Sequence, residues 1–124
     1  MDDLVQWYGA CLDDEERVAR AAAEDDGPGW HYDGRAVLTC REGDMVAVGS
    51  QDFMEAERGT HIAAHDPARV LRDIDGRRRT LLRCQEAMPA ANPMLVHFAK
   101  QTVREMARSF SHLPGYEKAL ASFE

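Results

Sequence analysis

Apolar residues recur at helical spacing over the first part of the chain. In residues 3–23 they return every three or four positions and define one side of a helix, while charged residues occupy the other side. The predicted inward stripe consists of Leu4, Val5, Tyr8, Cys11, Leu12, Val18, Ala19 and Ala22. The acidic and glycine-rich run 24–29 ends this helix in a turn.

Residues 30–49 change to a strand pattern. Short runs with aromatic, β-branched or alternating residues cover 30–32, 36–41 and 45–48. They are separated by the turn signals Asp33-Gly34 and Glu42-Gly43-Asp44. Because these connections are too short for helices, the pattern predicts an antiparallel three-strand meander.

The helical pattern then returns in three segments. They are expected at about 52–64, 67–87 and 93–111, followed by a short docking segment at 114–123. Asp66-Pro67 and Asn92-Pro93 are start signals, because each places an N-cap side chain before a proline in the first helical position. The predicted inward positions are Phe53, Met54, Ala56, Ile62, Val70, Leu71, Ile74, Leu81, Leu82, Leu95, Phe98, Ala99, Val103, Met106 and Phe110.

Two glycines interrupt these helical patterns. Gly59 weakens the prediction of a helix at 52–64, and Gly76 lies inside the segment 67–87. A glycine in a helix interior costs roughly 1 kcal/mol relative to alanine, so we expect a bend or a close packing contact at Gly76.

These elements predict an α+β fold. Three long helices and a shorter helix would pack on the small antiparallel three-strand meander, since so small a sheet is marginal by itself. A chain of 124 residues corresponds to one domain, so residues 1–124 are expected to form a single domain.

The net charge of −7 is unevenly distributed along the sequence. Residues 1–66 carry sixteen acidic and five basic side chains, a net of −11, whereas residues 67–124 carry six and ten, a net of +4. The two halves could neutralise each other in the fold, or the asymmetry could mark an interaction surface.

Several classes of protein are disfavoured by the sequence. No apolar run is long enough to span a membrane, and no basic-then-apolar leader is visible, which favours a cytoplasmic protein. Cys11, Cys40 and Cys84 form no C-x-x-C pair, so reduced thiols are expected. Nucleotide-binding glycine loops and nucleophile-elbow motifs are absent, and no cofactor is expected.

The segment 61–75, HIAAHDPARVLRDID, offers the strongest candidate chemistry. His61 and His65 are four residues apart, and with Asp66 they could hold a metal if the helix continued through both histidines. Pro67, however, disfavours helical geometry at Asp66, so the helix is expected to end near Ala64. His65 would then pack on Val70 at the start of the next helix.

Two charged sets are candidate binding surfaces. The basic set on or beside the helix 67–87 consists of Arg69, Arg72, Arg77, Arg78, Arg79 and Arg83. The acidic set on the first helix consists of Asp13, Asp14, Glu15 and Glu16. We weigh three interpretations: pairing within the molecule, binding of a protein partner, and binding of nucleic acid, which the overall acidity disfavours.

The run HIAAHDPARVLRDIDGRRR resembles a motif of an uncharacterised family of small actinobacterial and actinophage proteins, classed as a domain of unknown function. Similar proteins begin with an acidic helix, often followed by a Gly-Pro-Trp-His element, whereas this chain carries an extra glycine in that element at Gly29. Many end in His-Pro-x-Tyr, for which residues 112–116 are a looser counterpart. The resemblance implies a mobile-element or phage context and supplies no catalytic residues.

The leading functional hypothesis is therefore a non-catalytic protein-interaction or regulatory factor of a mobile element or phage. The alternatives are a small metal-assisted hydrolase built on His61, His65 and Asp66, and a nucleic-acid binder that uses the arginine helix. Trp30, His31 and Tyr32 would either line a recognition pocket or close a small core. A homodimer through the first helix is conceivable from its amphipathic pattern.

Overall fold

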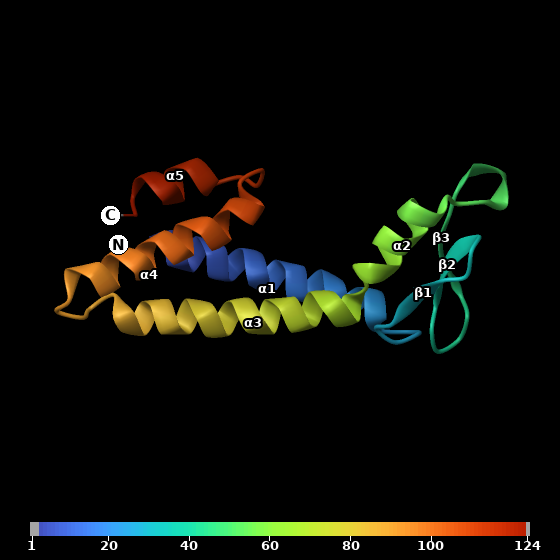
Figure 1. Cartoon of the computed structure of the whole chain (residues 1–124), viewed down its shortest axis with the longest axis horizontal. Coiled ribbons are helices and arrows are strands. Elements are labelled where there is room, and N and C mark those ends of the chain that lie inside the picture. The colour runs from blue at the N-terminus through green and yellow to red at the C-terminus, as the bar shows by residue number, and fades with distance from the viewer. Residues whose placement is uncertain (1–2, 124) are drawn as a thin grey trace. The chain divides into compact units, whose positions relative to one another are not determined.

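The computed structural model describes residues 3–123 and has the α+β architecture predicted from the sequence (Figure 1). Its elements in chain order are α1 (Asp3–Ala23), β1 (Trp30–Tyr32), β2 (Ala36–Thr39), β3 (Met45–Val48), η1 (Ser50–Asp52), α2 (Ala56–Ala64), α3 (Pro67–Ala87), α4 (Pro93–Ala107), η2 (Arg108–Phe110) and α5 (Tyr116–Ala121). No helix in this described range is long and apolar enough to cross a membrane.

The chain forms two compact units. Unit 1 comprises residues 1–14 and 74–124, and unit 2 comprises residues 15–73. The division falls inside α1 and inside α3, so each of these helices contributes residues to both units. Whether the whole chain unfolds as the expected single domain stays a prediction.

Unit 1 is helical and has a core built from the apolar stripes of its helices. Its largest fully buried side chains are Leu4, Tyr8, Leu12, Ile74 and Val103. The ring of Tyr8 lies 5.8 Å from that of Phe110, centroid to centroid. All six of these residues were predicted to point inward, so this part of the predicted core is confirmed.

The start of α4 follows from its capping chemistry. Asn92 has an extended backbone, and its side-chain oxygen accepts a hydrogen bond from the backbone N–H of Met94 at 3.0 Å. Pro93 occupies the first helical position, where it sacrifices no helical hydrogen bond. The α-helix ends at Ala107, and the last residues of the predicted segment 93–111 form the tighter turn η2 instead.

Unit 2 contains the sheet, in the order β1-β2-β3 with both pairs antiparallel. The first turn is held by Asp33, whose Oδ1 accepts hydrogen bonds from the backbone N–H groups of Arg35 and Ala36, each at 2.9 Å. Gly34 adopts a φ of 97°, which glycine tolerates without strain. The predicted meander and its tight turn are therefore confirmed.

Helix α2 contacts β1 and β2. It begins at Ala56 rather than at 52, because residues 51 and 52 have left-handed backbones, with φ values of 61° and 59°. Gly59 is buried, and a Cβ at this position would lie 2.2 Å from Cδ1 of Tyr32. The glycine that weakened the helix prediction is thus what lets the helix approach the sheet.

Several inward positions predicted from periodicity are wrong. Val18, Phe53, Leu82, Leu95 and Phe98 are exposed. The expected bend or close contact at Gly76 is not found either, because α3 continues through it and a Cβ there would meet no atom within 4 Å. An amphipathic stripe shows which side of a helix is apolar, but not how far along its length a neighbour covers it.

Candidate functional site

The junction between α2 and α3 positions the main candidate site, which lies in unit 2. One carboxylate oxygen of Asp66 accepts a hydrogen bond from the backbone N–H of Arg69 at 2.9 Å, which caps α3. The other oxygen accepts from the backbone N–H of Trp30 at 3.0 Å. The carbonyl of Pro28 adds a bond from the N–H of Ala68, also at 3.0 Å. Asp66 is therefore the N-cap of α3, as predicted. Its second hydrogen bond, from Trp30, also connects the start of the sheet to the start of α3.

This junction borders a surface pocket of about 350 Å³. The pocket is lined by Glu15, Val18, Ala19, Ala22, Trp30, His65, Pro67, Val70 and Asp73. Its walls are mostly apolar, and two carboxylates and one imidazole supply the polar groups. Pockets of this size with a few polar groups are ordinary sites for small ligands or inserted side chains.

The pocket explains why part of the predicted core is exposed. Val18 is 53% exposed and Ala22 is also exposed, although both continue the apolar stripe of α1. In unit 2 this part of the stripe forms a pocket wall. Both residues were predicted to lie in the core, so the apolar stripe did not indicate a pocket here. Trp30 was the lining residue for which a pocket role was considered from the sequence.

The histidine pair lies at the same junction. The ring centroids of His61 and His65 are 4.3 Å apart, and Nδ1 of His65 is 2.7 Å from the backbone carbonyl of His61, where its N–H donates. Both oxygens of Asp66 are bound to backbone N–H groups, as described above. In residues 3–123 no group of three or more potential ligands is placed to hold a metal ion. The expected end of the helix near Ala64 is confirmed, and the metal role stays a prediction.

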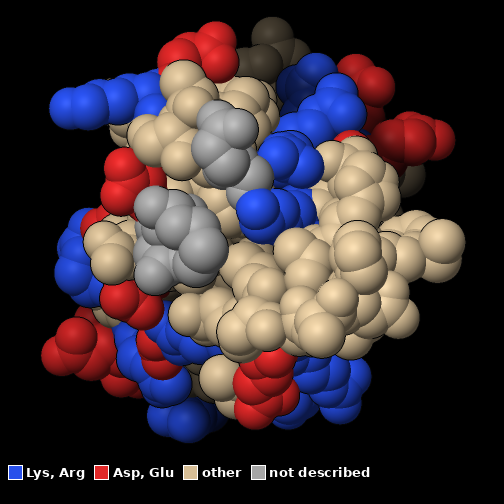
Figure 2. Space-filling model, turned by 90° about the vertical axis from the view of Figure 1, so that its left-hand side faces the viewer, with Lys and Arg blue, Asp and Glu red and all other residues tan. Residues whose placement is uncertain are grey.

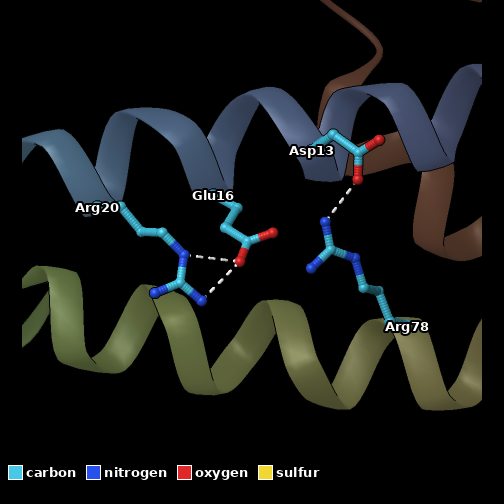
Figure 3. A network of polar contacts seen from close by, with 4 residues as sticks. All are labelled: Asp13, Glu16, Arg20 and Arg78. Carbon is cyan, nitrogen blue, oxygen red and sulfur yellow. Dashed lines mark hydrogen bonds and ion pairs between the residues drawn. The ribbon is translucent and has the colours of Figure 1, made fainter.

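The acidic run on α1 is not a single surface (Figure 3). In unit 1, Asp13 pairs with Arg78 of α3 at 2.5 Å. In unit 2, Glu16 accepts a hydrogen bond from Nε of Arg20 at 2.8 Å and forms an ion pair with Nη2 of the same side chain at 2.7 Å. Asp14 also takes part in an interaction, and Glu15 lines the pocket. The four predicted acidic residues therefore have different roles.

The arginine set is similarly divided. Arg77 donates to the hydroxyl of Ser109 at 2.8 Å, and Arg79 pairs with Asp75 one turn away. Arg69 donates to the carbonyl of Ala64 at 3.3 Å. Arg72 and Arg83 are exposed. Intramolecular contacts thus involve Arg69 and three consecutive residues of the set, and the choice among the three interpretations of these charges stays a prediction.

The folded units redistribute the charge seen along the sequence. Unit 1 carries nine acidic and eight basic side chains, a net of −1. Unit 2 carries thirteen acidic and seven basic side chains, a net of −6. The −11/+4 contrast between sequence halves disappears, because the acidic start of α1 and the basic end of α3 belong to the same unit. Nearly all of the net charge lies in unit 2.

The carboxyl group of Asp26 in unit 2 lies among other acidic side chains. A hydrogen bond with Asp44 raises the pKa of Asp26 above its ordinary value, with further contributions from burial and from repulsion by Asp44, Asp25 and Glu42. Such an upward shift favours the protonated acid and is expected where carboxylates crowd together. The shift therefore reflects how close Asp26 lies to other acidic side chains in the turns of unit 2.

The aromatic run on β1 divides between the two predicted roles. Trp30 lines the pocket, and His31 is exposed. Tyr32 closes the contact with α2, and its hydroxyl donates to the backbone carbonyl of Met54 at 2.6 Å. Trp30 is thus the member of the run that lines a pocket, Tyr32 is the member that packs against α2, and a recognition role for Trp30 stays a prediction.

The three cysteines form no disulfide. Cys84 is buried, and that burial raises the pKa of its thiol. A raised pKa keeps the sulfur in its poorly nucleophilic thiol form near neutral pH. This side chain is therefore a packing group of unit 1.

A second exposed apolar surface lies on α4 of unit 1. Met94, Leu95 and Phe98 share one helical face, and Phe98 is 62% exposed. Figure 2 looks onto the end of unit 1 that carries the α3–α4 connection, where uncharged side chains form a broad surface bordered by charges of both signs. Exposed apolar surface of this kind is typical of interaction sites.

No curated protein and no solved structure matches this chain. A family model does match, over residues 1–121, and it describes a family of unknown function. The match includes the acidic first helix, the sheet, the Asp66 junction and the pocket that the junction borders. The chain therefore belongs to DUF6221, a family of unknown function.

Proposed function

We propose that this protein is a non-catalytic interaction protein that binds a protein partner through the pocket of unit 2. The observation that carries the proposal is the pocket itself, in which exposed apolar side chains lie beside carboxylates. Apolar walls supply affinity by leaving water, and a few polar groups supply specificity. The net charge of −6 on unit 2 favours a partner with a basic surface.

The resemblance to small phage and actinobacterial proteins extends this proposal. We place the interaction in an accessory or regulatory task of a mobile element or phage. The metal-assisted hydrolase and the nucleic-acid binder stay predictions, and they differ from the interaction protein in what they must bind.

Affinity capture with a matched pair of variants tests the proposal. Val18→Lys places a cationic side chain in the pocket, whereas Leu82→Lys makes the same change at an exposed helical position of unit 1. The two positions have similar exposures, 53% and 56%, so both variants should fold. We expect the wild-type chain and Leu82→Lys to recover the same host protein and Val18→Lys to lose it.

The contrary result is equally clear. If Val18→Lys recovers every protein that the wild-type chain recovers, in the same yield, the pocket is not the binding site. Circular dichroism of both variants, measured before the capture, verifies that each keeps its helical content.

A further inference from the structure

The pocket of unit 2 presents two kinds of surface to an occupant. Val18, Ala22 and Val70 contribute apolar walls, whereas Glu15 and Asp73 contribute carboxylates. A wholly apolar occupant would take the carboxylate of Glu15 out of water without a partner, which is unfavourable. A small inorganic cation would leave the walls exposed. The lining therefore matches a side chain with an aliphatic stem and a cationic head.

We propose that the pocket receives an arginine side chain of the partner, a proposal that rests on the interaction function given above. The guanidinium group is planar, always charged, able to bind a carboxylate through two N–H groups, and suited to stacking on aromatic rings. Glu15 and Trp30 supply these two kinds of contact from the pocket lining. The aliphatic stem packs against the walls formed by Val18 and Val70.

Glu15 is the main carboxylate in this recognition. Within the described range 3–123 it makes no hydrogen bond or ion pair with another residue. The neighbouring Arg20 is held by Glu16 through two nitrogens, at 2.7 and 2.8 Å. Asp73 already takes part in another interaction, so it contributes chiefly to the negative potential. The carboxylate of Glu15 is thus available to bind an incoming group at the pocket.

The charge of the whole unit acts in the same direction. The thirteen acidic side chains of unit 2 outnumber its seven basic ones, and the raised pKa of Asp26 reflects carboxylates that crowd one another. A negative field of this kind raises the local concentration of basic segments and speeds their association. Long-range attraction and the local carboxylate therefore select the same class of partner.

Two short peptides test the proposal. Both peptides are capped at each end and have one central residue flanked by two alanines on each side. The central residue is arginine in one peptide and citrulline in the other. Citrulline has nearly the same shape as arginine but carries no charge. The ¹⁵N-labelled full chain offers one indole N–H per unit, Trp30 in the pocket and Trp7 in unit 1. Trp7 is bonded to the carbonyl of Pro114 at 3.0 Å and serves as the internal control.

We expect the arginine peptide to shift the Trp30 indole signal and the amides of Val18 and Val70, while the Trp7 signal stays in place. The citrulline peptide should bind about tenfold more weakly, as the loss of a charge-assisted hydrogen bond implies. Glu15→Gln should weaken arginine binding by a similar factor and leave citrulline binding unchanged. Glu86→Gln, an exposed position on α3 of unit 1, should change neither.

Equal shifts from the two peptides, or no shift from either at millimolar concentration, would overturn the arginine proposal. That failure is separate from a failure of the proposed function. Equal peptide binding combined with partner loss in Val18→Lys leaves the interaction function intact and removes only the arginine specificity. Retention of the partner by Val18→Lys removes the function itself.

Discussion

Replacing Asp66 tests whether one side chain holds the α2–α3 junction together. Asp66→Ala removes the N-cap of α3 and the acceptor for the backbone N–H of Trp30. Loss of an aspartate N-cap typically costs about 1 kcal/mol. Leaving a partly buried N–H without an acceptor costs about 1–2 kcal/mol more. The free energy of unfolding should therefore fall by about 2–3 kcal/mol.

Asp66→Ser separates the two contributions. A serine hydroxyl still caps the helix by accepting from the N–H of Arg69, but it cannot also reach Trp30 as the second carboxylate oxygen does. This variant should lose only about 1–2 kcal/mol. The expected order of stability is wild type, then Asp66→Ser, then Asp66→Ala.

Urea unfolding followed by circular dichroism measures these free energies, and thermal unfolding provides a second measure. For a chain of this length, a loss of 2–3 kcal/mol corresponds to a fall in Tm of about 6–12 °C. An Asp66→Ala variant within about 0.5 kcal/mol of the wild type, the range of ordinary surface substitutions, would show that Asp66 does not hold the junction. Equal destabilisation by serine and alanine would show that the N-cap contributes nothing.

The remaining predictions concern two helical glycines and two carboxyl groups. Gly59→Ala should lower the free energy of unfolding by about 1–3 kcal/mol, because its Cβ would lie 2.2 Å from Tyr32, and unchanged urea unfolding would contradict this contact. Gly76→Ala should instead raise it by about 0.5–1 kcal/mol, because the new methyl group meets nothing within 4 Å, and a loss of stability would count against an open site there. In a carboxyl NMR titration, the pKa of Asp33 should lie below its ordinary value of 3.8, because the backbone N–H groups of Ala36 and Arg35 bind its charged form. The contribution of Asp33 to stability is therefore present above its unfolded pKa and is lost as pH falls through the folded pKa. The pKa of Asp26 should lie above 3.8. Its contribution to stability is therefore present below its unfolded pKa and is lost as pH rises through the folded pKa. A pKa of Asp33 higher than that of Asp26 would contradict both assignments.

The elements of the fold were predictable because local chemistry specifies them. Asn92-Pro93 and Asp66-Pro67 mark helix starts by capping, and Asp33-Gly34 marks a turn by its backbone requirements. The start of α2 was predicted four residues too early. Residues 51 and 52 have left-handed backbones, but neither is a glycine, the residue that most clearly indicates such a backbone in a sequence.

The candidate site was less predictable, because a pocket depends on which apolar surface stays uncovered. Val18 and Leu95 follow the same periodic rule as the buried residues Leu12 and Val103. Only tertiary packing decides which of them a neighbour covers. The exposure of Val18 was therefore not indicated by the sequence, except that the apolar stripe of α1 runs past an acidic segment before it reaches Val18.

The charge pattern was visible in the sequence, but its meaning depended on the fold. Division of the sequence into halves suggested an acidic and a basic part, yet the contact between Asp13 and Arg78 brings the two signs together in unit 1. Most of the net charge lies on unit 2, and two of its acidic residues, Glu15 and Asp73, line the pocket. That this charge marks an interaction surface stays a prediction, and the structure adds only which folded unit carries the charge.

Photo-cross-linking from within the pocket shows whether a partner protein binds there. A benzophenone amino acid is introduced at Ala22, which lines the pocket, or at Leu82, an exposed control position in unit 1. On irradiation with the protein recovered by affinity capture, we predict a covalent adduct from position 22, attached next to an arginine of that partner, and none from position 82. An adduct from position 82 with none from position 22 would contradict the assignment of binding to the pocket of unit 2.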